Sequence, residues 1–192
     1  MKFQKEVIPV IPPKEIVIGD ASAPVKIVMF GDYESDACAK ATNVIAQLLK
    51  DYEGKINFVF RHFPLTKIHQ KAHKAAEAAI GAAQEGKFWE MHQYIFSHRQ
   101  NLGIISLKGY AREVGVMDKK FLDNLMNSYY GWFVQDDLKE GLSMGVTDIP
   151  CFFINGARFE KEPTHKNLEA TIKELLPKKS SSVVKMKETK RA

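Results

Sequence analysis

A serine and a cysteine separated by two residues, Ser35 and Cys38, lie where the chain is best placed for chemistry. An apolar run over 25–30 predicts a buried strand, a polar turn follows, and an apolar pattern of helical period begins at about Asp36. Ser35 to Cys38 is therefore expected where a strand passes into the N-terminus of a helix. The free backbone N–H groups and the dipole at that end of a helix stabilise a developing anion.

Other residue types with chemical potential are few. Cys38 and Cys151 are the only cysteines, which is too few for a disulfide framework and is typical of a reducing compartment. His69 and His73 have helical i, i+4 spacing, but a third metal ligand is not evident, and solvated histidines are favoured. The sequence therefore predicts no metal site.

Composition indicates an ordinary globular protein. Of the 192 residues, 45% are hydrophobic and 27% charged, and no apolar run approaches the ~20 residues that cross a bilayer. No membrane association is expected. The first residues lack the apolar core of a secretion signal, which favours a cytoplasmic location, or an extracytoplasmic (periplasmic) one if a leader has been removed.

The net charge of +5 is concentrated in the last residues of the chain. From Pro177 onward there are six cations and one anion, so residues 1–176 are neutral overall. A Ser/Lys-rich segment of this kind is expected to be a disordered, solubilising tail over 177–192. Binding to nucleic acid is therefore not predicted.

The hydrophobic pattern predicts an α/β protein in which two parallel strands flank a helix. Between the second of these strands and a C-terminal hairpin, the pattern is helical, and its aromatic residues, Trp89 and Trp132 among them, are expected in the core of that region. The predicted elements are an extended arm at 1–15, strands at 16–18, 25–30 and 56–60, a helix at 36–52, helices throughout 64–145, a hairpin around Asn155-Gly156 and a final helix capped by Thr164.

Several short motifs together resemble one family. They are Gly19–Val25, Phe30-Gly31-Asp32-Tyr33, Phe60–Leu65, Gly86–His92, Gly145–Pro150 and Phe152–Gly156. In this order they resemble the DsbA-like branch of the thioredoxin superfamily of thiol–disulfide oxidoreductases. The resemblance implies a thioredoxin-like fold formed by 16–63 and 146–176, with an inserted helical subdomain at 64–145.

The resemblance also implies positions for the site. Ser35 stands where the family has its nucleophilic cysteine, and Cys38 stands at the resolving cysteine, so the Cys-x-x-Cys pair is degenerate. Pro150 matches the proline whose preceding peptide bond is cis, and Ile149 matches the residue whose backbone meets an extended substrate. Met29 replaces a buried acid that assists the second cysteine in the family, and Asp36 replaces a common proline.

Three functional hypotheses follow. Disulfide exchange begins with attack by a thiolate, which Ser35 cannot supply, so at most monothiol chemistry remains at Cys38, acting on protein thiols or disulfides. Alternatively, Ser35 hydrogen-bonds the thiolate of bound glutathione in a transferase or isomerase, although a simple helix cap is favoured for this serine. The third hypothesis is a non-catalytic module that binds an extended peptide.

A further hypothesis concerns the second cysteine. If the loop before Cys151 packs against the helix start as in the family, Cys38 and Cys151 come close enough for a non-standard disulfide, provided their Cα atoms lie within about 7 Å. A small buried residue at the start of a strand is the favoured interpretation of Cys151.

Overall fold

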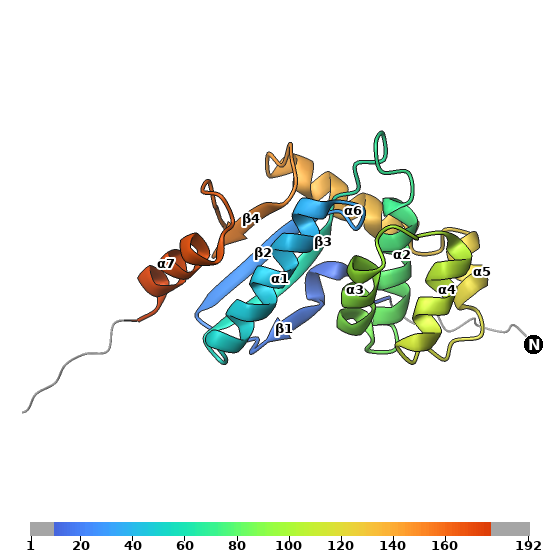
Figure 1. Cartoon of the computed structure of the whole chain (residues 1–192), viewed down its shortest axis with the longest axis horizontal. Coiled ribbons are helices and arrows are strands. Elements are labelled where there is room, and N and C mark those ends of the chain that lie inside the picture. Colours follow the sequence, from blue (N-terminus) through green and yellow to red (C-terminus); the bar gives the residue numbers. More distant parts are fainter. Residues whose placement is uncertain (1–9, 178–192) are drawn as a thin grey trace, which may run out of the picture.

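A five-stranded mixed β-sheet forms the centre of the molecule in a computed structural model, which describes residues 10–177 (Figure 1). Its spatial order is β1-β3-β2-β4-β5. β2 and β3 run parallel, whereas β1 pairs antiparallel with β3, and β4 pairs antiparallel with β2 and β5. The strands are β1 (Val17–Gly19), β2 (Val25–Gly31), β3 (Ile56–His62), β4 (Cys151–Ile154) and β5 (Ala157–Arg158).

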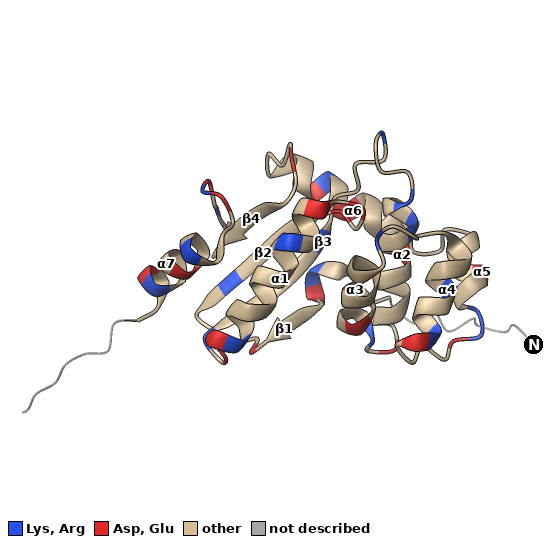
Figure 2. Ribbon diagram, in the orientation of Figure 1, with Lys and Arg blue, Asp and Glu red and all other residues tan. Residues whose placement is uncertain are grey.

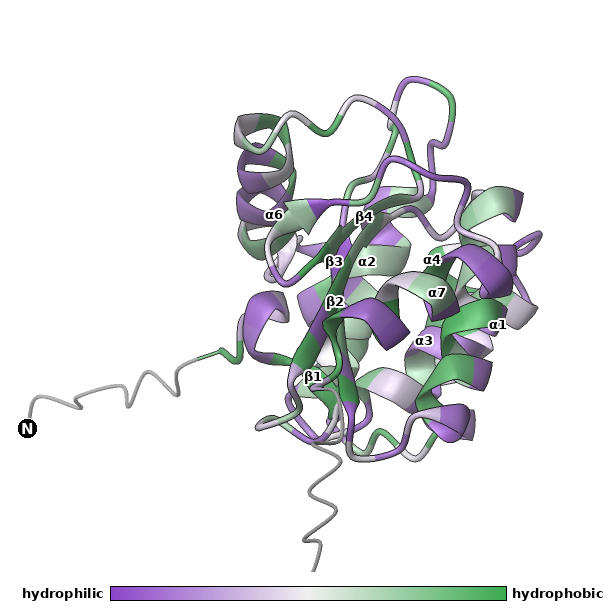
Figure 3. Cartoon of the chain, turned by 90° about the vertical axis from the view of Figure 1, so that its left-hand side faces the viewer, coloured by the Kyte–Doolittle hydropathy of each residue, from purple (hydrophilic) through white to green (hydrophobic). Residues whose placement is uncertain are grey.

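Helices cover both faces of this sheet. Figure 3 shows α6 on one side and α1, α3 and α7 on the other. The helices α2 to α6 all lie between β3 and β4 in the chain, as expected of a helical insertion. The bounds are α1 (Asp36–Asp51), α2 (Ala72–Ala83), α3 (Phe88–Ser97), α4 (Ile104–Glu113), α5 (Phe121–Met126), α6 (Gly131–Ser143) and α7 (His165–Leu175).

Alternation along the central strand β2 divides the core into two parts. Ile27 and Met29 pack in the larger cluster with α1, α7 and the helices α2 and α3. Phe30, which points to the opposite face, packs in a smaller cluster, against which Leu138 of α6 also lies. Successive side chains of a strand point to opposite faces, so a central strand covered on both sides is largely apolar; in β2, Lys26 near the start is exposed.

The helix α1 forms where its hydrophobic period predicts it. Cys38, Ala41, Ile45 and Leu48 are buried along one face, and Gly54, with φ of +69°, follows the C-terminal end. Glycine accepts this left-handed conformation without the steric cost that a side chain brings. The predicted strand–helix–strand unit is confirmed by the parallel register of β2 and β3, in which Val25 lies opposite Ile56.

The C-terminal hairpin and its following helix are also confirmed. Asn155 and Gly156 have φ of +48° and +83°, the combination that a two-residue type I′ turn requires. Thr164 is the N-cap of α7, and its hydroxyl oxygen accepts a hydrogen bond from the backbone N–H of Asn167 at 3.3 Å.

Two expectations are corrected. Within the predicted extended arm, Pro13–Glu15 form a 3₁₀ turn, η1, with Pro13 buried; proline's fixed φ suits the first position of a helical turn. Trp132, expected in the core, is 66% exposed on α6. Residues 1–9 of the arm and 178–192 of the predicted tail lie outside the described residues.

Candidate functional site

Ser35 begins α1 and caps it. Its hydroxyl oxygen accepts a hydrogen bond from the backbone N–H of Cys38 at 3.2 Å, and its own N–H donates to the carbonyl of Asp32, also at 3.2 Å. The residue is 8% exposed. The hydroxyl keeps its own proton after accepting this bond, so it can still donate toward an anion at the helix terminus.

Cys38 lies beneath this cap with no exposed surface. Burial raises the pKa of its thiol to about 11, outweighing the hydrogen bonds with the Ser35 side chain and the Asp32 backbone, which lower the pKa. At pH 7 only about one thiol in ten thousand is then a thiolate. Because the thiolate is the nucleophile in disulfide exchange, this environment disfavours attack by Cys38.

The loop before β4 lies beside the same end of the sheet. The Ile149–Pro150 peptide bond is cis, as the family resemblance implies. Cys151 pairs with Phe30, so Ile149 and Pro150 lie next to the end of β2 from which the chain leaves toward Ser35. Within residues 10–177, neither backbone polar group of Ile149 makes a backbone hydrogen bond. These groups are available to an added extended chain.

Cys151 does not meet Cys38. Both thiols are free and buried, so this structure contains no Cys38–Cys151 disulfide, and the pairing stays a prediction. Cys151 packs in the smaller cluster with Phe30 and Phe153, whereas Cys38 packs in the larger cluster on the other face of the sheet. Burial raises the pKa of the Cys151 thiol as well.

Sequence reasoning missed a carboxylate that ties the site loop to the loop after β3. The fully buried side chain of Asp32 accepts hydrogen bonds from the backbone N–H groups of Glu34 and Leu65, each at 2.8 Å, and from Nδ1 of His69 at 2.9 Å. Glu34 adds a second tie by accepting a bond from the backbone N–H of Lys71 at 2.7 Å. The loops that follow two parallel strands begin at the same edge of the sheet. This rule was the signal that could have predicted a contact between the two loops.

A buried polar network lies behind the site loop on β3 and α6. Asp137 accepts bonds from Nε of Arg61 at 2.7 Å and from both the backbone N–H and Nδ1 of His62, at 2.8 and 3.0 Å. Both terminal nitrogens of Arg61 then donate to the two carboxylate oxygens of Glu140. Charge-assisted, two-pronged bonds of this kind fix the side chains in one geometry.

Tyr33 and His92 form a second buried pair, joined at 3.0 Å between the phenol oxygen and Nδ1. Burial, together with a smaller effect of His62, lowers the pKa of His92 to about 3, so the ring is neutral. Burial also raises the pKa of Tyr33 well above its usual value. Met29, which is fully buried, leaves no carboxyl group at the position of the family's buried acid.

The histidines of the helical region pair with carboxylates. His69 contacts Asp32, while His73 contacts Glu77, and residues 10–177 contain no group of three potential metal ligands. None of the helices in that range is long and apolar enough to cross a bilayer. Figure 2 shows Lys and Arg interspersed with Asp and Glu over the helices and loops.

One family model and several known proteins are similar to this chain. The model of a family described as Thioredoxin matches residues 12–174. Curated relatives include the Na(+)/H(+) antiporters NhaA 1 of Salinispora arenicola, 34% identical over 86% of this chain, and NhaA 3 of Salinispora tropica, 35% identical over 79%. These matches cover 25% and 23% of the relatives, so the chain spans about a quarter of their length.

Solved structures share the fold at lower sequence identity. BdbD from Bacillus subtilis has a TM-score of 0.76 at 21% identity, covering 85% of this chain and 92% of its own. The thiol-disulfide exchange protein alpha-DsbA2 from Wolbachia pipientis has a TM-score of 0.72 at 22% identity, covering 83% and 86%. A thioredoxin-like oxidoreductase from Silicibacter pomeroyi has a TM-score of 0.71 at 23% identity, covering 83% and 90%.

Proposed function

Because the chain belongs to the thioredoxin family and has the DsbA-like form of its fold, we propose that it holds extended, cysteine-containing polypeptides without turning over their disulfides. One observation carries this proposal: a serine caps α1 directly above a cysteine with no exposed surface and a pKa of about 11. Multiple-turnover exchange needs an attacking thiolate and a resolving thiol, and this pair offers neither at neutral pH. At most, slow monothiol chemistry remains at Cys38.

The loop that carries the cis bond supports the binding half of the proposal. The free backbone groups of Ile149 suit the addition of one extended strand, a mode in which main-chain hydrogen bonds supply affinity. Asp32 and Glu34 fix the loop before α1 to the segment after β3, because they accept hydrogen bonds from the backbone there. A polypeptide is therefore the proposed partner.

Insulin reduction with dithiothreitol tests the proposal. Wild type is expected to match the uncatalysed rate, whereas Ser35→Cys places a thiol at the helix terminus and is expected to accelerate turnover. Ser35→Ala is the matched control, because it removes the hydroxyl without adding sulfur. Rapid turnover by wild type would refute the proposal. In the double variant Ser35→Cys, Cys38→Ala, the introduced thiolate is expected to attack an insulin disulfide, releasing one of its sulfurs as a thiolate and keeping the other in a mixed disulfide that mass spectrometry detects.

A second candidate is glutathione binding at Ser35. The Ser35 hydroxyl accepts one hydrogen bond and retains its proton, so it can donate to a glutathione thiolate at the N-terminus of α1. Calorimetric titration at millimolar glutathione distinguishes the candidates. Heat that is present in wild type and absent in Ser35→Ala supports glutathione, whereas no heat in either protein removes this candidate.

The similarity to the antiporters concerns only one segment of those proteins. The segment like this chain makes up about a quarter of those proteins, and the thioredoxin match covers most of the present chain. In this proposal the shared segment is a thioredoxin-fold unit, and ion transport belongs to the remainder of those relatives.

A further inference from the structure

A cavity separates α1 from α3, away from the loop that carries the cis bond. α1 packs on β3 and α7, while α3 packs on α2 and α4, and about 900 Å³ of space lies between the two helices. Ala39 and Ala46 line it from α1, Trp89 and Phe96 from α3, and Phe58 from β3. Small side chains opposite aromatic rings leave this space, whose size is typical of small-molecule sites between structural layers.

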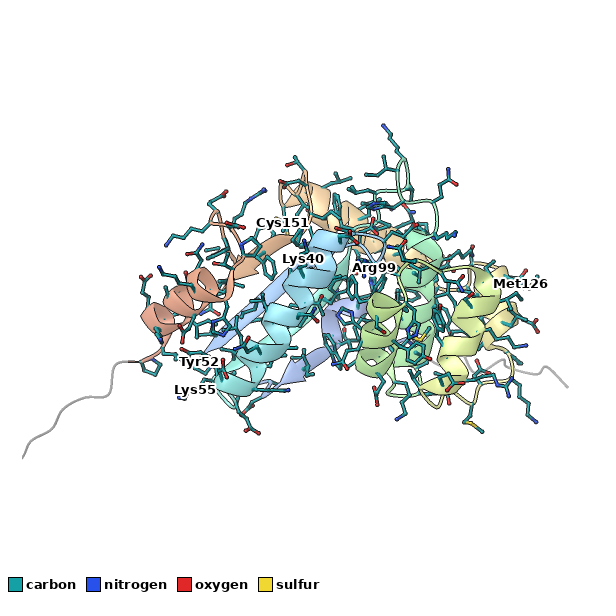
Figure 4. All side chains as sticks on the ribbon, in the orientation of Figure 1. Lys40, Tyr52, Lys55, Arg99, Met126 and Cys151 are labelled. Atoms are coloured by element: carbon teal, nitrogen blue, oxygen red, sulfur yellow. The ribbon has the colours of Figure 1, made fainter. Side chains whose placement is uncertain are left out.

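One end of the cavity is positively charged. Arg99, just beyond α3, lines the cavity and donates from Nε to Asp36, the first residue of α1. Figure 4 shows Arg99 beside α3, near the N-terminal end of α1. Among residues 10–177, neither terminal nitrogen of its guanidinium donates a hydrogen bond, so the planar fork is free to bind a second anion.

The other end carries a carboxylate, which gives the cavity a direction. Glu90, which pairs with Lys87 at 3.1 Å, lines the cavity from the first turn of α3, and the helix rises about 10 Å between Glu90 and Ser97, two residues before Arg99. An acidic group on a bound molecule is therefore favoured at Arg99 and disfavoured near Glu90.

The wall also contains polar atoms without partners. Thr42 is 9% exposed and His92 is 1% exposed, both line the cavity, and within residues 10–177 Thr42 Oγ1 and His92 Nε2 have no hydrogen-bond partner. Buried polar atoms are normally paired, but both of these atoms are themselves closed off from solvent, so they add polarity behind the wall and no contact with a bound molecule is assigned to them.

We propose that this cavity binds an aromatic organic anion, with its rings between α1 and α3 and its carboxylate or sulfonate on Arg99. The apolar wall accounts for the rings and the free guanidinium fork for the acidic group. This site does not depend on the chemistry of Ser35 or Cys38, so its test is independent of the function proposed above.

The test uses 8-anilinonaphthalene-1-sulfonate and its uncharged analogue N-phenyl-1-naphthylamine. Trp132→Phe removes the exposed second tryptophan and leaves Trp89, in the cavity wall, as the reporter. Both probes are expected to quench Trp89 fluorescence at one saturable site. In this background Arg99→Gln is expected to weaken the sulfonate about fivefold and leave the neutral probe unchanged. Arg112→Gln, an exposed charge loss outside this cavity, is the matched control and is expected to change neither.

Filling the cavity gives a second readout. Ala46→Phe is expected to abolish binding of both probes while the circular dichroism spectrum stays that of wild type. Unchanged probe binding in folded Ala46→Phe would overturn the proposal, as would the absence of Trp89 quenching or equal weakening by Arg99→Gln and Arg112→Gln. If Ala46→Phe does not fold, the quenching and the two arginine variants decide the question.

Discussion

The hydroxyl oxygen of Ser35 lies 3.2 Å from the backbone nitrogen of Cys38 and accepts its hydrogen bond. Through this contact Ser35 stabilises the first turn of α1. Ser35 is also the residue nearest the helix terminus. The contact also places the buried thiol one turn inside the helix, where the cap and the side chains around it exclude solvent. The first two predictions concern these two residues.

Removing the Ser35 cap is expected to destabilise the protein. Ser35→Ala leaves the Cys38 N–H without its partner and should lower the free energy of unfolding by about 1 kcal/mol. Urea unfolding followed by circular dichroism measures it. Thr164→Ala, which removes the cap of α7, is the comparison and should have a similar effect. A loss for Thr164→Ala with none for Ser35→Ala would show that the Ser35 contact contributes nothing.

The Cys38 thiol is expected to destabilise the fold at alkaline pH. Its pKa rises from 9.0 to about 11 on folding, so the native state holds its proton more tightly and stability falls as pH rises through this range. The loss is on the order of 2–3 kcal/mol by pH 11. Unfolding free energies at pH 8, 9.5 and 10.5 should differ in slope between wild type and Cys38→Ala. Equal slopes would contradict a raised pKa.

His92 is expected to produce the opposite pH dependence. Its pKa falls from 6.5 to about 3 on folding, so the unfolded state binds the extra proton and stability is lost as pH falls below about 6.5. The slope contributed is at most about 1.4 kcal/mol per pH unit. His92→Phe should flatten the curve between pH 6.5 and 4. Identical curves for wild type and His92→Phe would exclude this origin.

Asp137 is expected to be the buried polar side chain whose removal destabilises the protein most. Asp137→Ala leaves Nε of the buried Arg61 and the backbone N–H of His62 without partners, while Glu140 still pairs with Arg61, and should cost about 2–4 kcal/mol. Chemical denaturation measures the loss. Asp136→Ala, the exposed neighbour on α6, should change stability by less than about 0.5 kcal/mol. Similar losses in both variants would argue against the buried network.

Features that depend on neighbouring residues were predictable. The Ser35 and Thr164 caps, the Asn155-Gly156 turn and the apolar face of α1 all follow from side-chain chemistry within a few positions. The cis bond before Pro150 was predictable only through the resemblance, because cis is the minority state of an X–Pro bond.

Features that depend on packing were not predictable. Trp132 falls within a helical hydrophobic pattern, yet α6 turns it outward, where Lys139 lies 4.7 Å above its ring. Likewise, η1 forms in a proline-rich stretch because it packs against β3 and α6. Composition alone does not indicate which apolar residues meet a neighbouring element.

By itself, the sequence determined that a hydroxyl stands at the start of α1 with a thiol three residues later, because residue identity and helix phase are local properties. Only the tertiary structure decided that the thiol has no exposed surface, that Cys151 lies across the sheet from it, and that Asp32 meets His69. Those outcomes depend on which strand face each side chain takes and which loops share a sheet edge. Both are settled when distant segments pack together and exclude water.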